Sequence, residues 1–172
     1  DECYCDIFRM NRPKPPGALE AAASIGSGLG NLIIFNSLSK RSNASGMRAG
    51  FIAGDENIIE SYKLLVSNGA SPVPIPIQKV AASLYDDEEH HVKACIHYDQ
   101  NFEIVEEYLK PFYKDFKIPY GGFFLWLKVD DDEIAAKVLW NKFSLRVMPG
   151  RYMAKNVEGL NPVSYTHLTL PT

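Results

Sequence analysis

The feature that most constrains this chain is a short apolar run that stops at a lysine-bearing loop. Leu32–Phe35 is apolar, and the residues after it are small, hydroxyl-bearing or cationic. A short apolar run with such flanks indicates a buried strand that leads into a loop at a site. The loop is Asn36–Gly50, with the sequence NSLSKRSNASGMRAG.

The loop combines side chains that suit a phosphorylated carbonyl cofactor. Lys40 carries an amine that can attack a carbonyl carbon, and Ser37 and Ser39 carry hydroxyls that can donate to phosphate oxygens. Arg48 can bind a phosphate through two parallel hydrogen bonds. The alternative is a solvated surface loop with an ordinary lysine, because Ser-x-Ser-Lys alone is a short motif.

Composition excludes several other classes of protein. The 172 residues are 46% hydrophobic and 23% charged, which is enough to bury a core. A net charge of -3 gives no signature of polyanion binding, so we expect no nucleic acid partner. No apolar run approaches the roughly 18–20 residues that span a bilayer, and no signal peptide is evident, so we expect no membrane partner. The 3 cysteines, an odd number without framework spacing, favour the cytoplasm.

Two residues near the beginning of the chain are candidates to contact a cofactor ring. Asp1 and Tyr4 lie where a strand would end and a loop begin. A carboxylate there can pair with a protonated ring nitrogen, and a phenol can donate to a ring oxygen. Because the chain starts at Asp1 without a start-like tail, we interpret it as beginning inside a larger protein. Cys3 and Cys5 have no second pair of ligands at metal spacing, so we predict no metal site.

Downstream of the loop, the pattern predicts a second strand followed by three helices. The expected elements are a strand at 51–53, a helix at 55–69 capped by Asp55, a helix beginning at Pro76, and a helix at 87–110 that Pro111 ends. The long helix should face inward with Val92, Cys95, Ile96, Phe102, Val105 and Leu109. Its histidines, His90, His91 and His97, are assigned to a solvated face.

From about residue 112 the sequence shows a strand–helix–strand pattern. Residues 121–129 are rich in aromatic and aliphatic side chains, which is typical of a buried strand. Asp131 or Asp132 can cap a following helix, and 145–148 indicates a short strand. This strand–helix–strand unit predicts a small second domain, with the long helix as the bridge to it.

The ordered set of motifs resembles class I/II aminotransferases, which are fold-type I enzymes dependent on pyridoxal phosphate. The resemblance covers residues 1 to about 162. The short sequences at residues 36–43 and 50–55 look most like those of bacterial succinyldiaminopimelate aminotransferases, which act in lysine and peptidoglycan-precursor synthesis. The motifs are Asp1-x-x-Tyr4, Ser37-x-Ser39-Lys40, Gly46-x-Arg48-x-Gly50 and Gly121-Gly122-Phe123-Phe124-Leu125-Trp126.

This resemblance implies an α/β fold. Residues 1–111 would form part of the large cofactor-binding domain, a mainly parallel sheet with helices that ends in the interdomain helix. Residues 112–162 would form part of the small α+β C-terminal domain. The parent would be a cytoplasmic homodimer that transfers an amino group from glutamate to a keto acid, expected to be N-succinyl-2-amino-6-ketopimelate. The alternatives are another pyridoxal-phosphate enzyme of this fold, such as a carbon–sulfur lyase, or a non-catalytic fragment.

The resemblance also implies a role for each candidate residue. Lys40 would hold the cofactor covalently and, once released, serve as base and acid. Asp1 would keep the pyridine nitrogen protonated so that the ring can withdraw electrons. Tyr4 would hydrogen-bond the phenolic oxygen of the ring. The phosphate would be bound by Ser37, Ser39 and Arg48.

The sequence departs from the family in three ways. The N-terminal half is missing, and so is the arginine that binds the α-carboxylate of the substrate, so we expect this chain to be inactive alone. Residues 163–172 are similar to translated sequencing-adapter DNA, and we interpret them as a non-native tail without a packed role. Arg41 and Asn43 either shape the entrance to the site or serve the structure.

Overall fold

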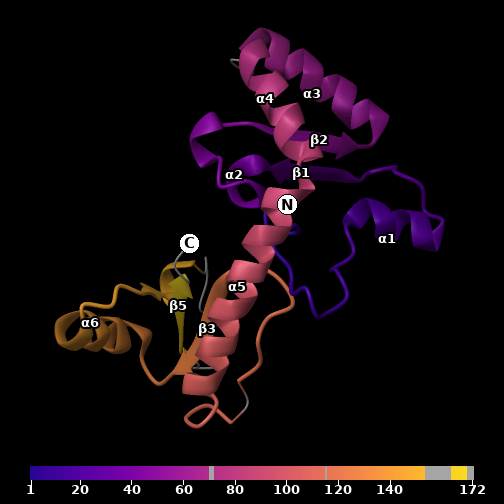
Figure 1. Ribbon diagram of the computed structural model, residues 1–172. Helices are drawn as coiled ribbons and strands as arrows, with labels where there is room; N and C mark the ends of the chain where they lie inside the picture. The colour runs from indigo at the N-terminus through magenta and orange to yellow at the C-terminus, as the bar shows by residue number, and fades with distance from the viewer. Residues whose placement is uncertain (70–71, 115, 154–163, 170–172) are drawn as a thin grey trace. The chain divides into compact units, whose positions relative to one another are not determined.

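The computed structural model describes residues 1–69, 72–114, 116–153 and the backbone of 164–169 (Figure 1). The chain divides into two compact units. Unit 1 consists of residues 1–100 and 120–122, and unit 2 consists of residues 101–119 and 123–172. Within the described residues, no helix is both long enough and apolar enough to cross a membrane.

Unit 1 contains a pair of antiparallel strands at the positions predicted. β1 (Ile33–Ser37) pairs with β2 (Gly50–Gly54) in a register that joins Ser37 to Gly50. The connection between them holds a four-residue helix, α2 (Leu38–Arg41), and a 3-10 turn, η1 (Ser45–Met47). A side chain at residue 50 would place its Cβ 2.2 Å from the carbonyl oxygen of Asn36, so only glycine allows this close pairing.

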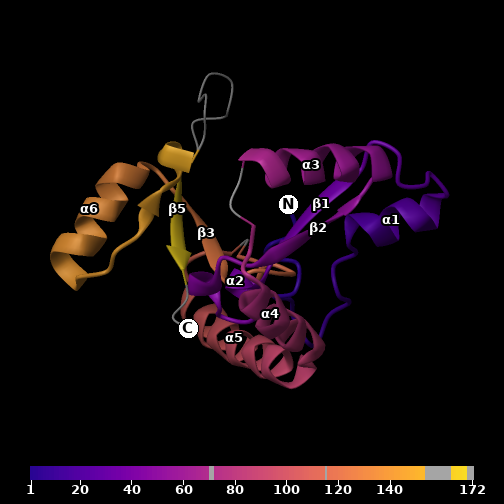
Figure 2. The same cartoon turned by 90° about the horizontal axis from the view of Figure 1, so that it is seen from above.

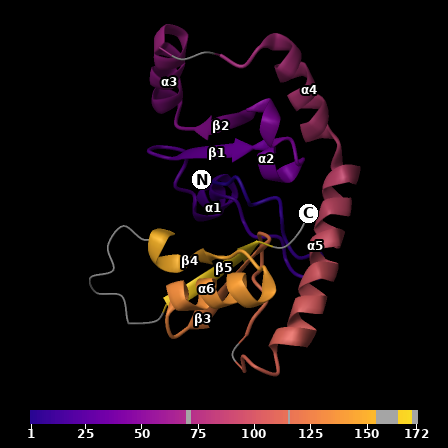
Figure 3. The same ribbon diagram turned by 90° about the vertical axis from the view of Figure 1, so that its left-hand side faces the viewer.

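Four helices complete unit 1, and one of them continues into unit 2. Figures 1 and 3 show α3 on the side of β2 that faces away from β1. The predicted cap of α3 is confirmed, because Asp55 Oδ1 accepts from the backbone N–H of Asn57 at 2.8 Å. The first helix was not predicted from the sequence. The helices are α1 (Ala18–Ile25), α3 (Glu56–Gly69), α4 (Ile75–Asp86) and α5 (Glu88–Leu109).

The buried face of α5 differs in part from the predicted one. Cys95 and Phe102 are buried as expected, and Tyr98 joins them. Ile96 is 44% exposed, so its predicted inward position is wrong. The solvated position predicted for His91 is also wrong, because His91 is only 4% exposed. His91 precedes Cys95 by four residues, and residues four apart lie on the same side of a helix.

A short segment distant in sequence belongs to unit 1 through backbone hydrogen bonds. The N–H of Arg9 donates to the carbonyl of Tyr120 at 3.1 Å, and the N–H of Gly122 donates to the carbonyl of Ile7 at 2.7 Å. The side chain of Arg9 is buried and donates to Asp99 at 3.2 Å and to the carbonyl of Gly122. These bonds fix residues 120–122 beside the N-terminal segment.

Unit 2 is a three-stranded antiparallel sheet with one helix along it (Figure 2). Its spatial order is β3-β5-β4, and β5 pairs with both neighbours. The elements are β3 (Phe124–Val129), α6 (Asp132–Phe143), β4 (Met148–Pro149), the 3-10 turn η2 (Gly150–Met153) and β5 (Ser164–Thr169).

The central strand of this sheet corrects one expectation. Residues 163–172 were expected to have no packed role, yet the backbone of 164–169 pairs along the whole of β3. The sequence here, Ser-Tyr-Thr-His-Leu-Thr, is rich in residues that favour strands, which explains how the segment can pair. Residues 163 and 170–172 lie outside the described part of the chain.

The core of unit 2 is apolar. Phe102 and Leu125 are each 1% exposed. Five partly buried side chains pack against them: Val105, Leu109, Phe116, Ile118 and Leu127. The two candidate caps of α6 have separate functions, because Asp131 accepts from the N–H of Ile134 at 2.8 Å whereas Asp132 accepts from the N–H of Arg151 at 2.8 Å.

All strand pairs among the described residues are antiparallel. A mainly parallel sheet was predicted, and no parallel pair is found among these strands. The connection between β1 and β2 runs from residue 38 to residue 49. A parallel pair needs a crossover of about a dozen residues or more that returns along the sheet, whereas this connection is folded into two short turns.

Candidate functional site

The candidate site begins with Lys40 in the four-residue helix that follows β1. Leu38 is fully buried and anchors this turn, and its N–H donates to the carbonyl of Ala49 at 3.2 Å. Ser37 caps the turn, because its Oγ accepts from the N–H of Ser39 at 3.1 Å. The hydroxyls of Ser37 and Ser39 are 2.9 Å apart. Two hydroxyls therefore lie together within three residues of the lysine.

The structure brings the N-terminal segment to Lys40. Lys40 Nζ lies 5.9 Å from the centre of the Tyr4 ring. The N–H of Glu2 donates to the carbonyl of Phe35 at 2.8 Å, which holds this segment against β1. Asp1 is exposed, and its Oδ1 accepts from the N–H of Cys3 at 2.9 Å. The phenol of Tyr4 and the amine of Lys40 thus lie together, with the segment that carries Tyr4 bonded to β1.

Arg48 lies at the opposite end of the connection between the strands. It has a left-handed backbone, with φ of 51°, and its side chain is exposed. Its Nη1 donates to the carbonyl of Ser45 at 3.1 Å. Because Gly50 pairs with Ser37, the strand register brings the chain back toward the serine hydroxyls just after Arg48.

A cavity of about 620 Å³ lies between the strand pair and helices α3 and α4. Asn36, Arg48, Tyr62, Gln78 and Tyr85 supply its polar lining. Among the predicted site residues, only Arg48 lines it, whereas Lys40 and Tyr4 do not. Arg48 therefore connects the lining of this cavity to the predicted site residues.

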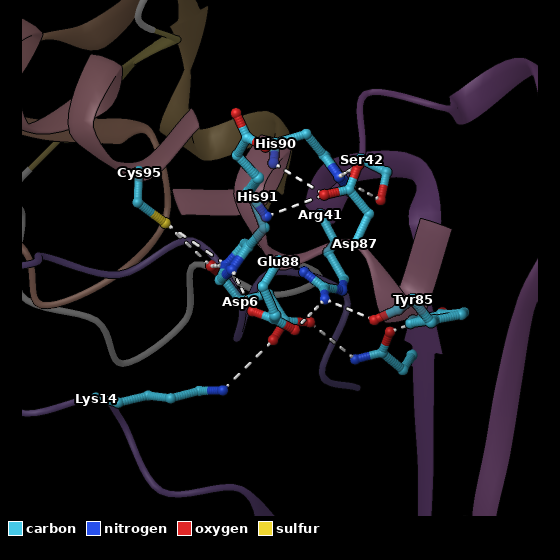
Figure 4. A network of polar contacts seen from close by, with 12 residues as sticks. Asp6, Lys14, Arg41, Ser42, Tyr85, Asp87, Glu88, His90, His91 and Cys95 are labelled. Carbon is cyan, nitrogen blue, oxygen red and sulfur yellow. Dashed lines mark hydrogen bonds and ion pairs between the residues drawn. The ribbon is translucent and has the colours of Figure 1, made fainter. Parts of the chain in front are cut away.

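Buried polar contacts hold the lysine turn to the junction of α4 and α5 (Figure 4). Arg41 is 5% exposed and donates through Nη2 to the carbonyl of Tyr85 at 3.0 Å and to Glu88 Oε1 at 2.6 Å. Of the two roles left open for Arg41, the structure supports the structural one. Desolvation of the Glu88 carboxylate by its neighbours raises its pKa, but the charge of Arg41 and the bond with His91 outweigh this and leave that pKa below its ordinary value.

The same junction holds the N-terminal segment. His91 Nε2 is hydrogen-bonded to the carbonyl of Asp6, and Cys95 Sγ donates to that carbonyl at 3.3 Å. The other ring nitrogen of His91 is 3.3 Å from Glu88 Oε2. Sequence reasoning missed this use of His91, although its spacing of four from Cys95 was a signal that it faces inward.

A second series of hydrogen bonds joins β1 to α4 and to the N-terminal segment. Tyr85 donates its hydroxyl to Asn36 Oδ1 at 2.9 Å, and burial raises the pKa of Tyr85 to about 12, which keeps this donor protonated. Asn36 Nδ2 donates in turn to Asp6 Oδ2 at 3.4 Å. Lys14 lies 3.6 Å from the other oxygen of Asp6.

The cysteines are free thiols. Burial, followed by the charge of Asp6, raises the pKa of Cys5 to about 11, so this thiol stays protonated at neutral pH. Within the part of the chain that the structure describes, no group of three His, Cys, Asp or Glu side chains could hold a metal ion.

Known proteins resemble this chain over nearly all of its length. The sequence model of the family described as aminotransferase class I and II matches residues 1–165. The solved structure of an aminotransferase from Neisseria meningitidis superposes with a TM-score of 0.92 at 38% sequence identity. It covers 99% of this chain, which spans 44% of that protein.

Curated relatives are more distant. A 4-dedimethylamino-4-oxo-anhydrotetracycline transaminase from Streptomyces rimosus is 27% identical over 96% of this chain and 45% of its own length. An LL-diaminopimelate aminotransferase from Natranaerobius thermophilus is 28% identical over 96% of this chain and 43% of its own length. The chain thus spans less than half the length of the relatives that it matches.

Proposed function

The chain belongs to the class I and II aminotransferases, whose cofactor is pyridoxal phosphate. We propose that it supplies the part of a transaminase site that contains the cofactor-binding lysine. The observation that carries this proposal is the placement of Lys40 Nζ beside the Tyr4 ring and the paired hydroxyls of Ser37 and Ser39. An amine beside a phenol, with two hydroxyl donors within three residues along the chain, matches what a phosphorylated pyridine aldehyde requires. The predicted α/β fold class and the cofactor are confirmed by the family match.

The residues present fit the cofactor. Bound pyridoxal phosphate supplies an aldehyde carbon that accepts amines and a ring that withdraws electrons from the substrate. Lys40 Nζ would hold the cofactor and, once released, would move a proton between the substrate carbon and the cofactor. Asp1 would keep the ring nitrogen protonated, and Tyr4 would donate to the ring oxygen. The side chains of Ser37, Ser39 and Arg48 would bind the phosphate.

We assign the substrate to the diaminopimelate group. The complete enzyme would take the amino group of glutamate and transfer it to N-succinyl-2-amino-6-ketopimelate. The short sequences at residues 36–43 and 50–55 support this substrate, because they resemble those of succinyldiaminopimelate aminotransferases. A second candidate is unsuccinylated diaminopimelate, which is favoured by the name of the Natranaerobius thermophilus relative. Both candidates place the enzyme in lysine and peptidoglycan-precursor synthesis in the cytoplasm.

An assay of the complete enzyme that contains this sequence tests the proposal. N-succinyl-LL-diaminopimelate and LL-diaminopimelate are each offered as amino donor to 2-oxoglutarate, and glutamate formation is measured. We expect the succinylated donor to have the higher kcat/KM. A higher value for the free amino acid would favour the second candidate. Release of pyruvate and ammonia from a cysteine-type substrate, without glutamate formation, would instead indicate a carbon–sulfur lyase.

The 172-residue chain is proposed to be inactive alone, because relatives contain more than twice its length and their other half would complete the site. Glutamate and each keto acid are incubated with this chain and excess cofactor. Transamination above the protein-free rate would contradict the proposal.

The complete enzyme is proposed to be a homodimer. Members of this family commonly form dimers, and Leu64, Leu65 and Ile75 are each about two-thirds exposed here, which leaves apolar surface to be covered. Light scattering after gel filtration of the complete enzyme should give twice the mass of one chain.

A further inference from the structure

We propose that Arg41 and His91 are positioning residues that fix the lysine and the tyrosine of the site to one helical junction. The lysine segment is residues 36–42, and the tyrosine segment is residues 1–7. The junction is residues 85–95, where α4 ends and α5 begins. This inference rests on the proposed function, because it assumes that Lys40 and Tyr4 contact the cofactor.

Arg41 fixes the lysine segment. It follows Lys40 directly, and its guanidinium is buried and bonded to the carbonyl of Tyr85 at 3.0 Å. Ser42 adds a second contact, because its Oγ is 2.9 Å from His90 Nε2. A buried guanidinium that lost its acceptor would pay a desolvation penalty, so the bond holds the turn in one place.

His91 fixes the tyrosine segment. Its ring is buried and bonded to the carbonyl of Asp6, which also accepts from Cys95. The N–H of Ile7 donates to the carbonyl of Tyr4 at 3.1 Å, which closes a turn around Asp6. Fixing the carbonyl of Asp6 therefore also fixes the backbone of Tyr4.

The two contacts come from successive turns of the same junction. Tyr85 lies at the end of α4, and His91 lies on the first turn of α5. Glu88 lies between them and contacts both Arg41 and His91, at 2.6 and 3.3 Å. Because Glu88 is exposed, its ion pair contributes little, and most of the restraint comes from the bonds to backbone carbonyls. The positions of Lys40 and Tyr4 are thus both tied to the junction between α4 and α5.

The restraint can be measured without cofactor in the complete enzyme that contains this sequence. Arg41→Met removes the contact to the lysine segment, and His91→Leu removes the contact to the tyrosine segment. Each loses a buried hydrogen bond, so amide hydrogen exchange in the corresponding segment should become about tenfold faster. His91→Gln keeps an N–H donor and should restore slow exchange. His97→Leu, at an exposed position of the same helix, is the matched control and should leave exchange unchanged.

The effect on the site is measured by reductive labelling. The complete enzyme that contains this sequence is treated with pyridoxal phosphate and borohydride, and peptide masses give the labelling of Lys40 relative to Lys63, which is exposed here. Pyridoxal without phosphate is the control for phosphate binding. We expect selective labelling of Lys40 in the unmodified enzyme, and about a tenfold loss of that selectivity in Arg41→Met and in His91→Leu. His91→Gln should restore the selectivity.

The outcomes separate this inference from the proposed function. Unchanged exchange in the segment that each substitution releases would overturn the inference. Faster exchange with unchanged Lys40 selectivity would overturn it as well, because the contacts would then serve only stability. Faster exchange in variants of a complete enzyme whose Lys40 is never labelled above Lys63 would sink the proposed function, while the contacts of Arg41 and His91 would stand.

Discussion

Among the described residues, the two units of this chain differ in how many buried polar side chains they hold, with three in unit 1 and one, Asp132, in unit 2. In unit 1, Arg9, Arg41 and His91 are buried, and each is bonded to a backbone carbonyl. In unit 2, the centre is formed by Phe102 and Leu125 with apolar neighbours around them. The first kind of contact is directional, whereas the second depends mainly on area and volume.

This difference bears on which unit can carry chemistry. Apolar packing accepts several side chains of similar volume, but it fixes no atom against a specific partner. A buried polar group loses free energy unless its partner stays within hydrogen-bond distance, so it keeps the backbone around it in place. The unit that carries Lys40 therefore has the contacts that a precise site needs.

The largest expected effect tests the apolar side of the comparison. Leu125→Ala should lower the free energy of unfolding by about 2–5 kcal/mol, because it leaves a cavity at a fully buried position. Leu125→Met should cost less than about 1.5 kcal/mol, because it keeps the volume. Urea unfolding followed by circular dichroism measures both values. Equal costs for the two substitutions would mean that shape and not volume governs this core.

The next effect tests the strand pair that carries the lysine turn. Gly50→Ala should cost about 1–3 kcal/mol, because its Cβ would lie 2.2 Å from the carbonyl oxygen of Asn36 and force the strands apart. Gly30→Ala is the control, because no described atom lies within 4 Å of the position of its Cβ. The same urea titration compares them, and a cost for Gly30→Ala as large as that for Gly50→Ala would contradict the explanation.

Much of the fold could be predicted from local signals. The two strands around the lysine loop, the cap by Asp55 and the long helix after Asp87 all follow from apolar periodicity and capping residues. The pairing of residues 164–169 could not, because the order of strands in a sheet depends on contacts between distant segments. Similarity to translated adapter DNA suggested a tail without a packed role, whereas the propensity of its residues allowed a strand.

The candidate site could be predicted only in part. The proximity of Lys40 and Tyr4 was expected from their order in a known family, and the structure brings the two side chains together. The buried position of His91 was not expected, because a histidine pair at the start of a helix suggests solvent contact. Its acceptor is the backbone carbonyl of Asp6, 85 residues away, which no side-chain pattern encodes.

A smaller effect tests the buried charge of unit 2 through its pH dependence. Burial pushes the pKa of Asp132 upward, but the bonds from Arg151 outweigh it and lower that pKa below its ordinary value. A lowered pKa contributes stability that is present above the unfolded pKa of 3.8 and lost as pH falls through the folded pKa. Asp132→Asn should therefore be less stable than the unmodified chain at pH 6, with the difference shrinking below about pH 4.

Thermal unfolding between pH 3 and pH 7 measures this difference. Asp130→Asn is the control, since Asp130 is an exposed aspartate on the same connection. A difference for Asp132→Asn that stays constant across this range would mean that packing, and not its charge, accounts for the role of Asp132.

The smallest effect concerns the cap of the lysine turn. Ser37→Ala removes the oxygen that accepts from the N–H of Ser39, and the loss of such a cap typically costs about 1 kcal/mol. Ser61→Ala is the matched control, because the hydroxyl of Ser61 only donates to a carbonyl within α3. Because α2 has four residues and one side-chain cap, loss of the cap should open α2 locally. The rate of amide hydrogen exchange at residues 38–42 should therefore increase by a larger factor than the change in global stability alone would give. If only global stability changed, α2 would be fixed by Leu38 and Arg41 alone, and the directional contacts of unit 1 would not include its cap.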